Sequence, residues 1–106
     1  QHPIGYDTFS KILFVVAKHY NVSTKEVMTR RRKAYMVKPR SVIINYILEN
    51  FKISTPKLGM FFNFDHSTVL HHRRQKVKQV GIWKPLELVW QDYEKIKKEL
   101  VKSLRS

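Results

Sequence analysis

The chain has 106 residues, of which 42% are apolar, and its 21 lysines and arginines outnumber its 8 acidic residues to give a formal net charge of +13. This length and composition predict one globular domain over residues 1–106 and exclude a disordered tail. The sequence contains no cysteine, which excludes disulfides and thiolate metal sites, and no apolar run approaches the roughly 20 residues of a transmembrane helix.

Two helices are predicted at the start of the chain. Apolar side chains recur at helical spacing from Phe9 to Val16 and indicate a first helix over residues 7–19. Residues 23–26 (STKE) have the pattern of a capping box, in which the serine and glutamate side chains each accept a hydrogen bond from the other residue's backbone N–H. This box predicts a short second helix that ends near Thr29.

Residues 30–37 (RRRKAYMV) are too basic to bury and predict an exposed loop. Residues 25–78 as a whole hold 13 basic and 3 acidic residues, whereas the rest of the chain holds 8 and 5. An excess concentrated in this way indicates a polyanionic partner, because neutralising phosphates releases condensed counterions. Three consecutive arginines also suit a narrow, electronegative DNA minor groove. The alternative is a solvated loop that attracts nucleic acid only through long-range charge.

A third helix is predicted to be the centre of the core. Residues 38–40 (KPR) open it, and it continues to Phe51. Its apolar residues nearly encircle it, which is the pattern of a helix covered by other elements on most sides.

Residues 54–80 predict a helix–turn–helix. Ser54 or Thr55 can cap the first helix by accepting a hydrogen bond from an unpaired N–H. Asn63 marks the turn, and Asn63 or Asp65 can cap the second helix. A last helix is predicted over residues 84–104, with Trp83 and Trp90 as its anchors. Its apolar face is formed by Leu86, Val89, Tyr93, Ile96, Leu100 and Leu104. The predicted fold is therefore all-α, with six helices and a core over residues 7–81.

A helical wheel separates two faces of the second helix of the motif. One face is apolar and is predicted to pack against the third helix; it holds Val69, Leu70, Val77 and Val80. The opposite face is predicted to meet solvent or a ligand; it holds Thr68, His71, His72, Gln75 and Gln79.

The first turn of this helix carries Asp65, His66 and Ser67, and in the usual docking of a helix–turn–helix it points into the DNA major groove. Histidine and serine can hydrogen-bond to base edges, Thr68 can also touch a thymine methyl, and aspartate can accept from cytosine. Two alternatives are that Asp65 only caps the helix and that His66 only packs beneath its start.

Three short segments of the sequence carry a resemblance to a known family. Residues 38–40 (KPR), residues 58–59 (LG) and above all residues 65–71 (DHSTVLH) resemble the C-terminal DNA-binding domain of the bacterial replication initiator DnaA. The family's signature is Asp-His-Thr-Thr-Val-Leu-His, from which only Ser67 departs, and serine keeps the hydroxyl. The resemblance covers about residues 9–80. It implies sequence-specific binding of double-stranded DNA at a bacterial or phage replication origin.

The resemblance also implies roles for single residues. The signature helix would read the major groove, while Arg32 from the basic loop enters the adjacent minor groove of a short A·T-rich box. Residues expected to hold phosphates are Arg31, Lys38, Arg40, His71 and Arg74. Contacts of this kind position the protein, whereas those to base edges specify the sequence. We expect a monomer in the cytoplasm, associated with the nucleoid.

The sequence lacks the residue spacings that catalytic and metal-binding sites need. The histidines of the motif lack the i, i+4 spacing of a helical zinc site, and no cysteine or carboxylate completes a ligand set. The eight acidic residues are scattered, so they do not form the carboxylate cluster that a magnesium-dependent nuclease needs. We therefore expect no enzymatic activity, no metal and no cofactor.

Two other functions remain open from the sequence. The apolar face of the last helix, if exposed, would make the chain a protein-interaction module with an acidic partner. Alternatively, Phe61, Phe62 and Phe64 would stack on bases in a non-specific single-stranded nucleic-acid binder of a mobile element. Packing of these rings around the turn is the favoured interpretation, because consecutive phenylalanines at a helical corner usually point inward.

Overall fold

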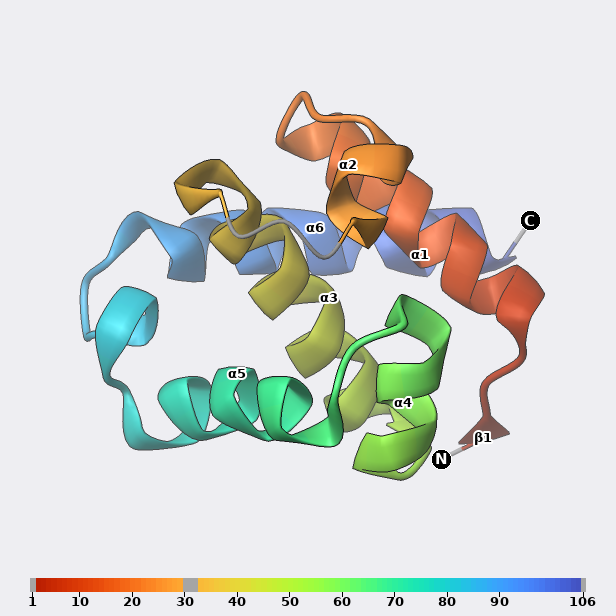
Figure 1. Cartoon of the computed structure of the whole chain (residues 1–106). Coiled ribbons are helices and arrows are strands. Elements are labelled where there is room, and N and C mark those ends of the chain that lie inside the picture. The colour runs from red at the N-terminus through yellow and green to blue at the C-terminus, as the bar shows by residue number, and fades with distance from the viewer. Residues whose placement is uncertain (1, 30–32, 106) are drawn as a thin grey trace.

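The computed structural model describes residues 2–29 and 33–105 (Figure 1). Over these residues the elements follow in the order β1 (His2–Pro3), α1 (Tyr6–His19), α2 (Thr24–Met28), η1 (Ala34–Met36), α3 (Val37–Asn50), β2 (Phe51–Lys52), α4 (Thr55–Phe62), α5 (His66–Lys78), η2 (Gly81–Trp83) and α6 (Leu88–Arg105), where η denotes a 3-10 helix. The prediction of an all-α fold with six α-helices is confirmed for this part of the chain. None of the described helices is long and apolar enough to cross a membrane.

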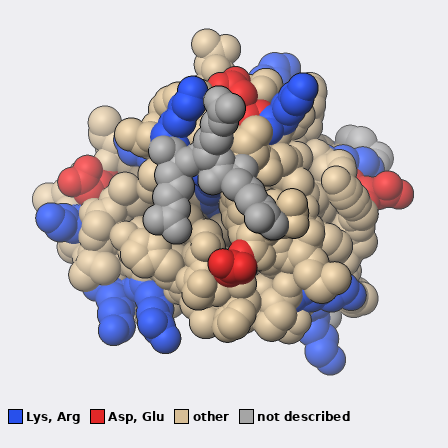
Figure 2. Space-filling model, viewed as in Figure 1, with Lys and Arg blue, Asp and Glu red and all other residues tan. Residues whose placement is uncertain are grey.

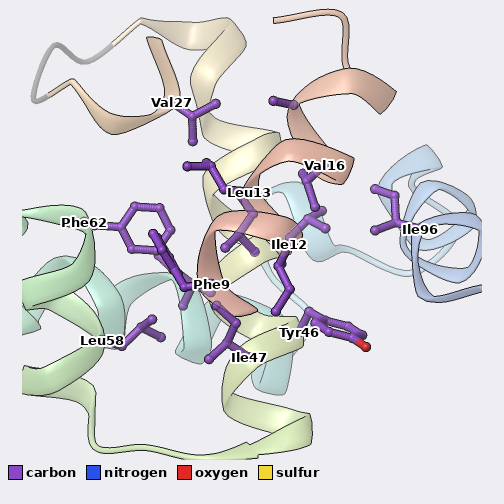
Figure 3. Packing of buried hydrophobic residues seen from close by; sticks show 14 of the residues in the cluster. Phe9, Ile12, Leu13, Val16, Val27, Tyr46, Ile47, Leu58, Phe62 and Ile96 are labelled. Atoms are coloured by element: carbon purple, nitrogen blue, oxygen red, sulfur yellow. The ribbon is translucent and has the colours of Figure 1, made fainter. Parts of the chain in front are cut away.

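Helix α3 is the centre of the molecule, as its sequence predicts. Every residue from Pro39 to Ile47 is buried. In Figure 1, α4 and α5 lie on one side of α3, and α1 and α6 lie on the other. Figure 3 shows the resulting core, in which Phe9 and neighbouring side chains of α1 face residues of α3 and α4. The rings of Phe9 and Phe62 meet edge to face, with centroids 5.1 Å apart.

Two local features position the start of the chain. The capping box of α2 is confirmed, since Ser23 Oγ accepts from Glu26 N at 3.0 Å and Glu26 Oε1 accepts from Ser23 N at 3.2 Å. The sequence did not predict the short parallel pairing of β1 with β2, in which His2 lies opposite Phe51. This pairing holds the N-terminal segment beside the end of α3.

The segment before α3 is more structured than predicted. Residues 30–37 were expected to form an exposed loop, but residues 34–36 form η1 and Met36 is only 1% exposed. The loop interpretation is wrong there because Met36 joins the apolar core despite its basic neighbours. Arg30, Arg31 and Arg32 lie outside the described residues.

Helix α6 packs against α1 and α3 through its apolar face, which includes Val89, Tyr93, Ile96 and Leu100, all buried. The alternative that this face is an exposed surface for a partner protein is therefore wrong. Leu86 is also not part of it, because the helix begins two residues later and Leu86 is 99% exposed.

Both tryptophans anchor α6, as predicted from the sequence. Trp83 is fully buried and its Nε1 donates to Ser41 Oγ at 2.8 Å. Trp90 Nε1 donates to the Trp83 carbonyl oxygen at 3.2 Å, and the two rings pack edge to face. The start of α6 is thereby attached to α3 at Ser41.

Candidate nucleic-acid interface

The turn between α4 and α5 is built by short-range contacts. Ser54, and not Thr55, caps α4, because its Oγ accepts from Lys57 N at 3.3 Å. Asn63 ends α4 in the left-handed conformation, with φ of 61°. The backbone then turns so closely over Gly59 that a Cβ there would lie 2.7 Å from the Phe64 carbonyl oxygen. The predicted turn at Asn63 is confirmed, and it requires glycine at position 59.

The first turn of α5 is open to solvent. Asp65 occupies the N-cap position, and its carbonyl oxygen accepts from Thr68 N at 3.1 Å, but its side chain makes no capping hydrogen bond. The alternative that the Asp65 side chain only caps the helix is therefore wrong. His66 is exposed, so the alternative that it packs beneath the helix is wrong too. Ser67 is exposed and Thr68 is half-buried.

A groove of about 570 Å³ runs beside this turn, between α5 and the segment that leads into α3. It is lined by Lys33, Val37, Arg40, Asn63, Phe64, Asp65, Ser67, Thr68, His71, His72 and Gln75. The groove therefore brings together five of the sequence-predicted site residues: Arg40, Asp65, Ser67, Thr68 and His71.

Other predicted site residues lie around the groove. Lys38, His66 and Arg74 are exposed but do not line it. Arg31 and Arg32 lie outside the described residues. Sequence reasoning missed Lys33 and Val37 as lining residues. The spacing of Thr68, His71 and Gln75 on one helical face is the signal that identified the α5 side of the groove.

Arg40 is a structural residue of the groove wall. Its side chain is mostly covered, with the residue 7% exposed, and burial lowers the pKa of its guanidinium. Its Nε donates to the Val27 carbonyl oxygen at 2.9 Å, and its Nη2 donates to the carbonyl oxygens of Glu26 and Thr29. The guanidinium also lies 5.1 Å from the centroid of the Phe64 ring. Arg40 thus ties the C-terminal end of α2 to the turn before α5, a role that the sequence did not predict.

The helical-wheel assignment of α5 was partly wrong. His72 was expected to face solvent or a ligand, but it is 8% exposed and packs toward α3, where Asn45 Nδ2 donates to its carbonyl oxygen at 3.1 Å. Val77 and Val80, expected in the core, are 63% and 46% exposed. The prediction assumed that the most hydrophobic face of α5 is the buried one. The helix instead packs through the face that contains Val69 and His72.

Burial has a clear electrostatic consequence at His72. It lowers the pKa of the imidazole to about 4, and electrostatic interactions with His71 and Arg40 act in the same direction. The imidazole is therefore neutral near pH 7. Its Nδ1 is buried without a hydrogen-bond partner among the described residues.

The basic residues along α5 divide into two sets. Arg73 Nη1 and Lys76 Nζ lie 2.9 Å and 2.6 Å from Glu49 Oε2, so both are paired within the protein. Arg74 and Lys78 are exposed. Figure 2 shows lysine and arginine side chains gathered around α5 at the lower left of the face, with few acidic side chains beside them. This face offers cations to a polyanion.

The arrangement combines exposed hydrogen-bonding side chains with nearby cations. The tip of α5 presents a carboxylate, an imidazole and a hydroxyl, and Lys33 lies across the groove from them. Helix α6 lies on the other side of α3 and does not cover the tip (Figure 1). Among the described residues there is no group of histidine and carboxylate side chains that could hold a metal ion. Such a surface can contact phosphates and base edges.

All residues that line the groove fall within a match to a known protein family. The bacterial dnaA protein helix-turn-helix family matches residues 9–75, which include α4, the turn and most of α5. The chain belongs to this family. It is thus a DNA-binding domain of the replication-initiator type, and domains of this DnaA type are not normally enzymes.

Curated relatives agree with this assignment. The chain is 46% identical over 66 residues to the chromosomal replication initiator protein DnaA of Xanthobacter autotrophicus, a match that covers 60% of this chain and 13% of that protein. It is 33% identical over 94 residues to the DnaA protein of Bacteroides thetaiotaomicron, covering 87% of this chain and 20% of that protein. The chain therefore spans a fifth or less of the length of these DnaA proteins.

Proposed function

We propose that the domain binds double-stranded DNA sequence-specifically, with the first turn of α5 in the major groove. The observation that carries this proposal is the open tip of α5, where Asp65, His66 and Ser67 are exposed in succession beside a groove. The tip of a recognition helix is the part that reaches base edges in the docking of this motif. Thr68 lines the same groove, and we propose that its methyl group touches a thymine methyl.

We propose that Arg32 enters the minor groove. This residue lies outside the described part of the chain, but both ends of its segment are positioned by described residues. Lys33 lines the same groove as the tip of α5, and the carbonyl oxygen of Thr29 accepts from Arg40. Lys33, the described residue that follows Arg32, therefore lies beside the tip of α5, which supports the entry of the arginine into the groove next to the one that the tip reads. A narrow, A·T-rich minor groove would favour the arginine.

Phosphate contacts are proposed for the exposed cations around the reading turn. Lys38, His71 and Arg74 are exposed near the groove, and Arg31 precedes the proposed minor-groove residue. For Arg40 we favour a supporting role, because its donors already meet the carbonyl oxygens at the end of α2. The target is then a short A·T-rich box, bound by a monomer in the nucleoid.

The packing of the phenylalanines disfavours single-strand binding. Phe62 is fully buried, and Phe64 stacks on it with centroids 5.1 Å apart. The Arg40 guanidinium lies over the Phe64 ring. These rings are therefore engaged with the protein, and stacking on bases would require them to separate.

Selection from a pool of random duplexes tests the proposal. We expect one A·T-rich sequence to be enriched and to compete better than either of its separated strands. Affinity for this sequence should fall as salt rises, because phosphate contacts release counterions. Failure to enrich any sequence, or stronger binding to single strands, would contradict sequence-specific duplex binding.

A further inference from the structure

The C-terminal half of α5 is held by an aromatic cage around Lys76. The Nζ of Lys76 lies 4.7 Å from the ring centroid of Tyr93, 5.0 Å from that of Trp90 and 5.5 Å from that of Trp83. It also lies 2.6 Å from Glu49 Oε2, and only 13% of the Lys76 side chain is exposed. A cation over aromatic faces is attracted by their quadrupoles, more strongly when water is excluded.

Glu49 connects this cage to α3. Its Oε1 accepts from the Tyr93 hydroxyl at 2.8 Å, and its Oε2 accepts from both Arg73 and Lys76. Burial alone would raise the pKa of the Glu49 carboxyl, but the hydrogen bonds from Lys76 and Tyr93 and the charges of Lys76 and Arg73 bring the pKa below its ordinary value. The carboxylate is therefore charged near pH 7, and it joins α3, α5 and α6 at one point.

Helix α5 is consequently held at both ends and in the middle. The tight turn over Gly59 holds its start, the bond from Asn45 to the His72 carbonyl oxygen holds its centre, and the cage holds its last turn. Releasing the last turn would allow α5 to tilt about the remaining two contacts. The rings of the cage come from residues 83–93, beyond the residues 9–75 that match the family.

We propose that Lys76 is a positioning residue for DNA recognition, which fixes the axis of α5 so that the exposed residues at its tip meet the base edges in the major groove. This inference rests on the proposed sequence-specific function. Because its side chain is mostly covered, Lys76 acts through the exposed residues at the tip of α5 and does not itself contact DNA. Loss of the cage should weaken discrimination between sequences more than it weakens attraction to DNA in general.

The test compares three variants of the full chain on the selected duplex and on a shuffled duplex of equal composition. For Lys76→Met we expect the ratio of the two affinities to fall about two- to thirtyfold, the range for residues that affect a site without touching its ligand. The dependence of affinity on salt should stay as in the unmodified protein. Lys76→Arg should restore much of the ratio, and Lys98→Met, which removes an exposed lysine of α6, should leave the ratio unchanged.

Tryptophan fluorescence gives an independent readout, because Trp83 and Trp90 are the only two tryptophans in the chain. Lys76→Met should shift their emission, whereas Lys76→Arg should shift it less. Circular dichroism checks that each variant is folded. If Lys76→Met does not fold, Trp90→Phe replaces it in the test. This variant keeps a ring in the cage and should also lower the affinity ratio.

Three results would overturn the inference. A folded Lys76→Met variant that keeps the original affinity ratio would show that the cage does not position α5. Equal losses on both duplexes, with a shallower salt dependence, would make Lys76 a phosphate contact. An unmodified protein that does not distinguish the two duplexes would contradict the proposed function itself, and the inference with it.

Discussion

The Tyr35 hydroxyl donates a 2.8 Å hydrogen bond to Glu26 Oε2, which joins η1 to α2. Arg30, Arg31 and Arg32 lie between these two residues in the sequence, so the contact joins the described segments that flank them. Glu26 takes part in the capping box of α2 through its other carboxylate oxygen, Oε1. The hydrogen bond from Tyr35 is the main reason why the pKa of Glu26 lies below its ordinary value. One carboxylate thus caps α2 and joins α2 to η1.

Replacing Tyr35 by phenylalanine should weaken DNA binding without unfolding the domain. The ring is half-exposed and can remain in place, but the hydrogen bond that joins η1 to α2 on either side of the three arginines is lost. We expect a few-fold loss of affinity for the selected A·T-rich duplex, measured by fluorescence anisotropy, and an unchanged melting temperature. Tyr6→Phe, at a similarly exposed tyrosine, is the matched control. Equal losses in both variants would contradict a role for the hydrogen bond between Tyr35 and Glu26.

Arg40→Met should lower stability because it removes the donors that serve the end of α2. The carbonyl oxygens of Val27, Glu26 and Thr29 would lose a charged partner. The expected loss is about 1–3 kcal/mol in the free energy of unfolding. Urea denaturation measures it, with the exposed Lys38→Met as control. A variant as stable as the unmodified protein would mean that water replaces the guanidinium at little cost.

Gly59→Ala should be destabilising because the turn leaves no room for a Cβ. The nearest atom would be the Phe64 carbonyl oxygen at 2.7 Å, which belongs to the backbone and cannot rotate away. Forcing atoms into a well-packed site costs about 1–3 kcal/mol. Thermal denaturation should therefore show a lower midpoint. Gly5→Ala is the control, since a Cβ at Gly5 has no atom within 4 Å among the described residues, and an equal effect there would contradict the steric explanation.

Features set by neighbouring residues were predictable from the sequence. The capping box at Ser23, a cap at Ser54 or Thr55 and the turn at Asn63 all depend on contacts within a few residues of chain. The central position of α3 followed from its nearly continuous apolar surface. The same reasoning placed the exposed residues of the α5 tip, because they precede the first buried residue, Val69.

Features set by distant contacts were not predictable from the sequence. The burial of Arg40 depends on carbonyl oxygens at the end of α2, and that of Lys76 depends on rings from η2 and α6. A helical wheel shows which side chains share a face but not which face meets α3. The predictions that His72 is exposed and that Val77 is buried were therefore wrong. The pairing of β1 with β2 likewise joins segments too short to carry a strand pattern.

His72 should make stability fall as the solution is acidified. The unfolded chain binds a proton at this imidazole near pH 6.5, whereas the folded protein does so only near pH 4, because burial disfavours the charged form. Stability is therefore full above pH 6.5 and is lost as pH falls toward 4, by about 3 kcal/mol in all. Urea denaturation across this range measures the loss.

A His72→Gln variant isolates this contribution, because glutamine does not titrate. Its stability should depend less on pH between 6.5 and 4 than that of the unmodified protein. His71→Gln, at the exposed neighbouring position, should keep most of the dependence, because burial is the largest cause of the lowered pKa of His72. Identical pH profiles for the unmodified protein and His72→Gln would mean that other groups cause the acid instability.

His66→Ala and Arg74→Ala should separate base reading from phosphate binding. His66 is exposed at the tip of α5, so its loss should weaken binding to the selected duplex by about 1–3 kcal/mol and leave a shuffled duplex nearly unaffected. Arg74 is exposed farther along the helix, and its loss should weaken both duplexes alike and reduce the salt slope by about 1. Titrations of both duplexes at several salt concentrations distinguish the two patterns. If both variants instead lose affinity equally on every duplex, the tip of α5 contributes charge or structure and does not read bases.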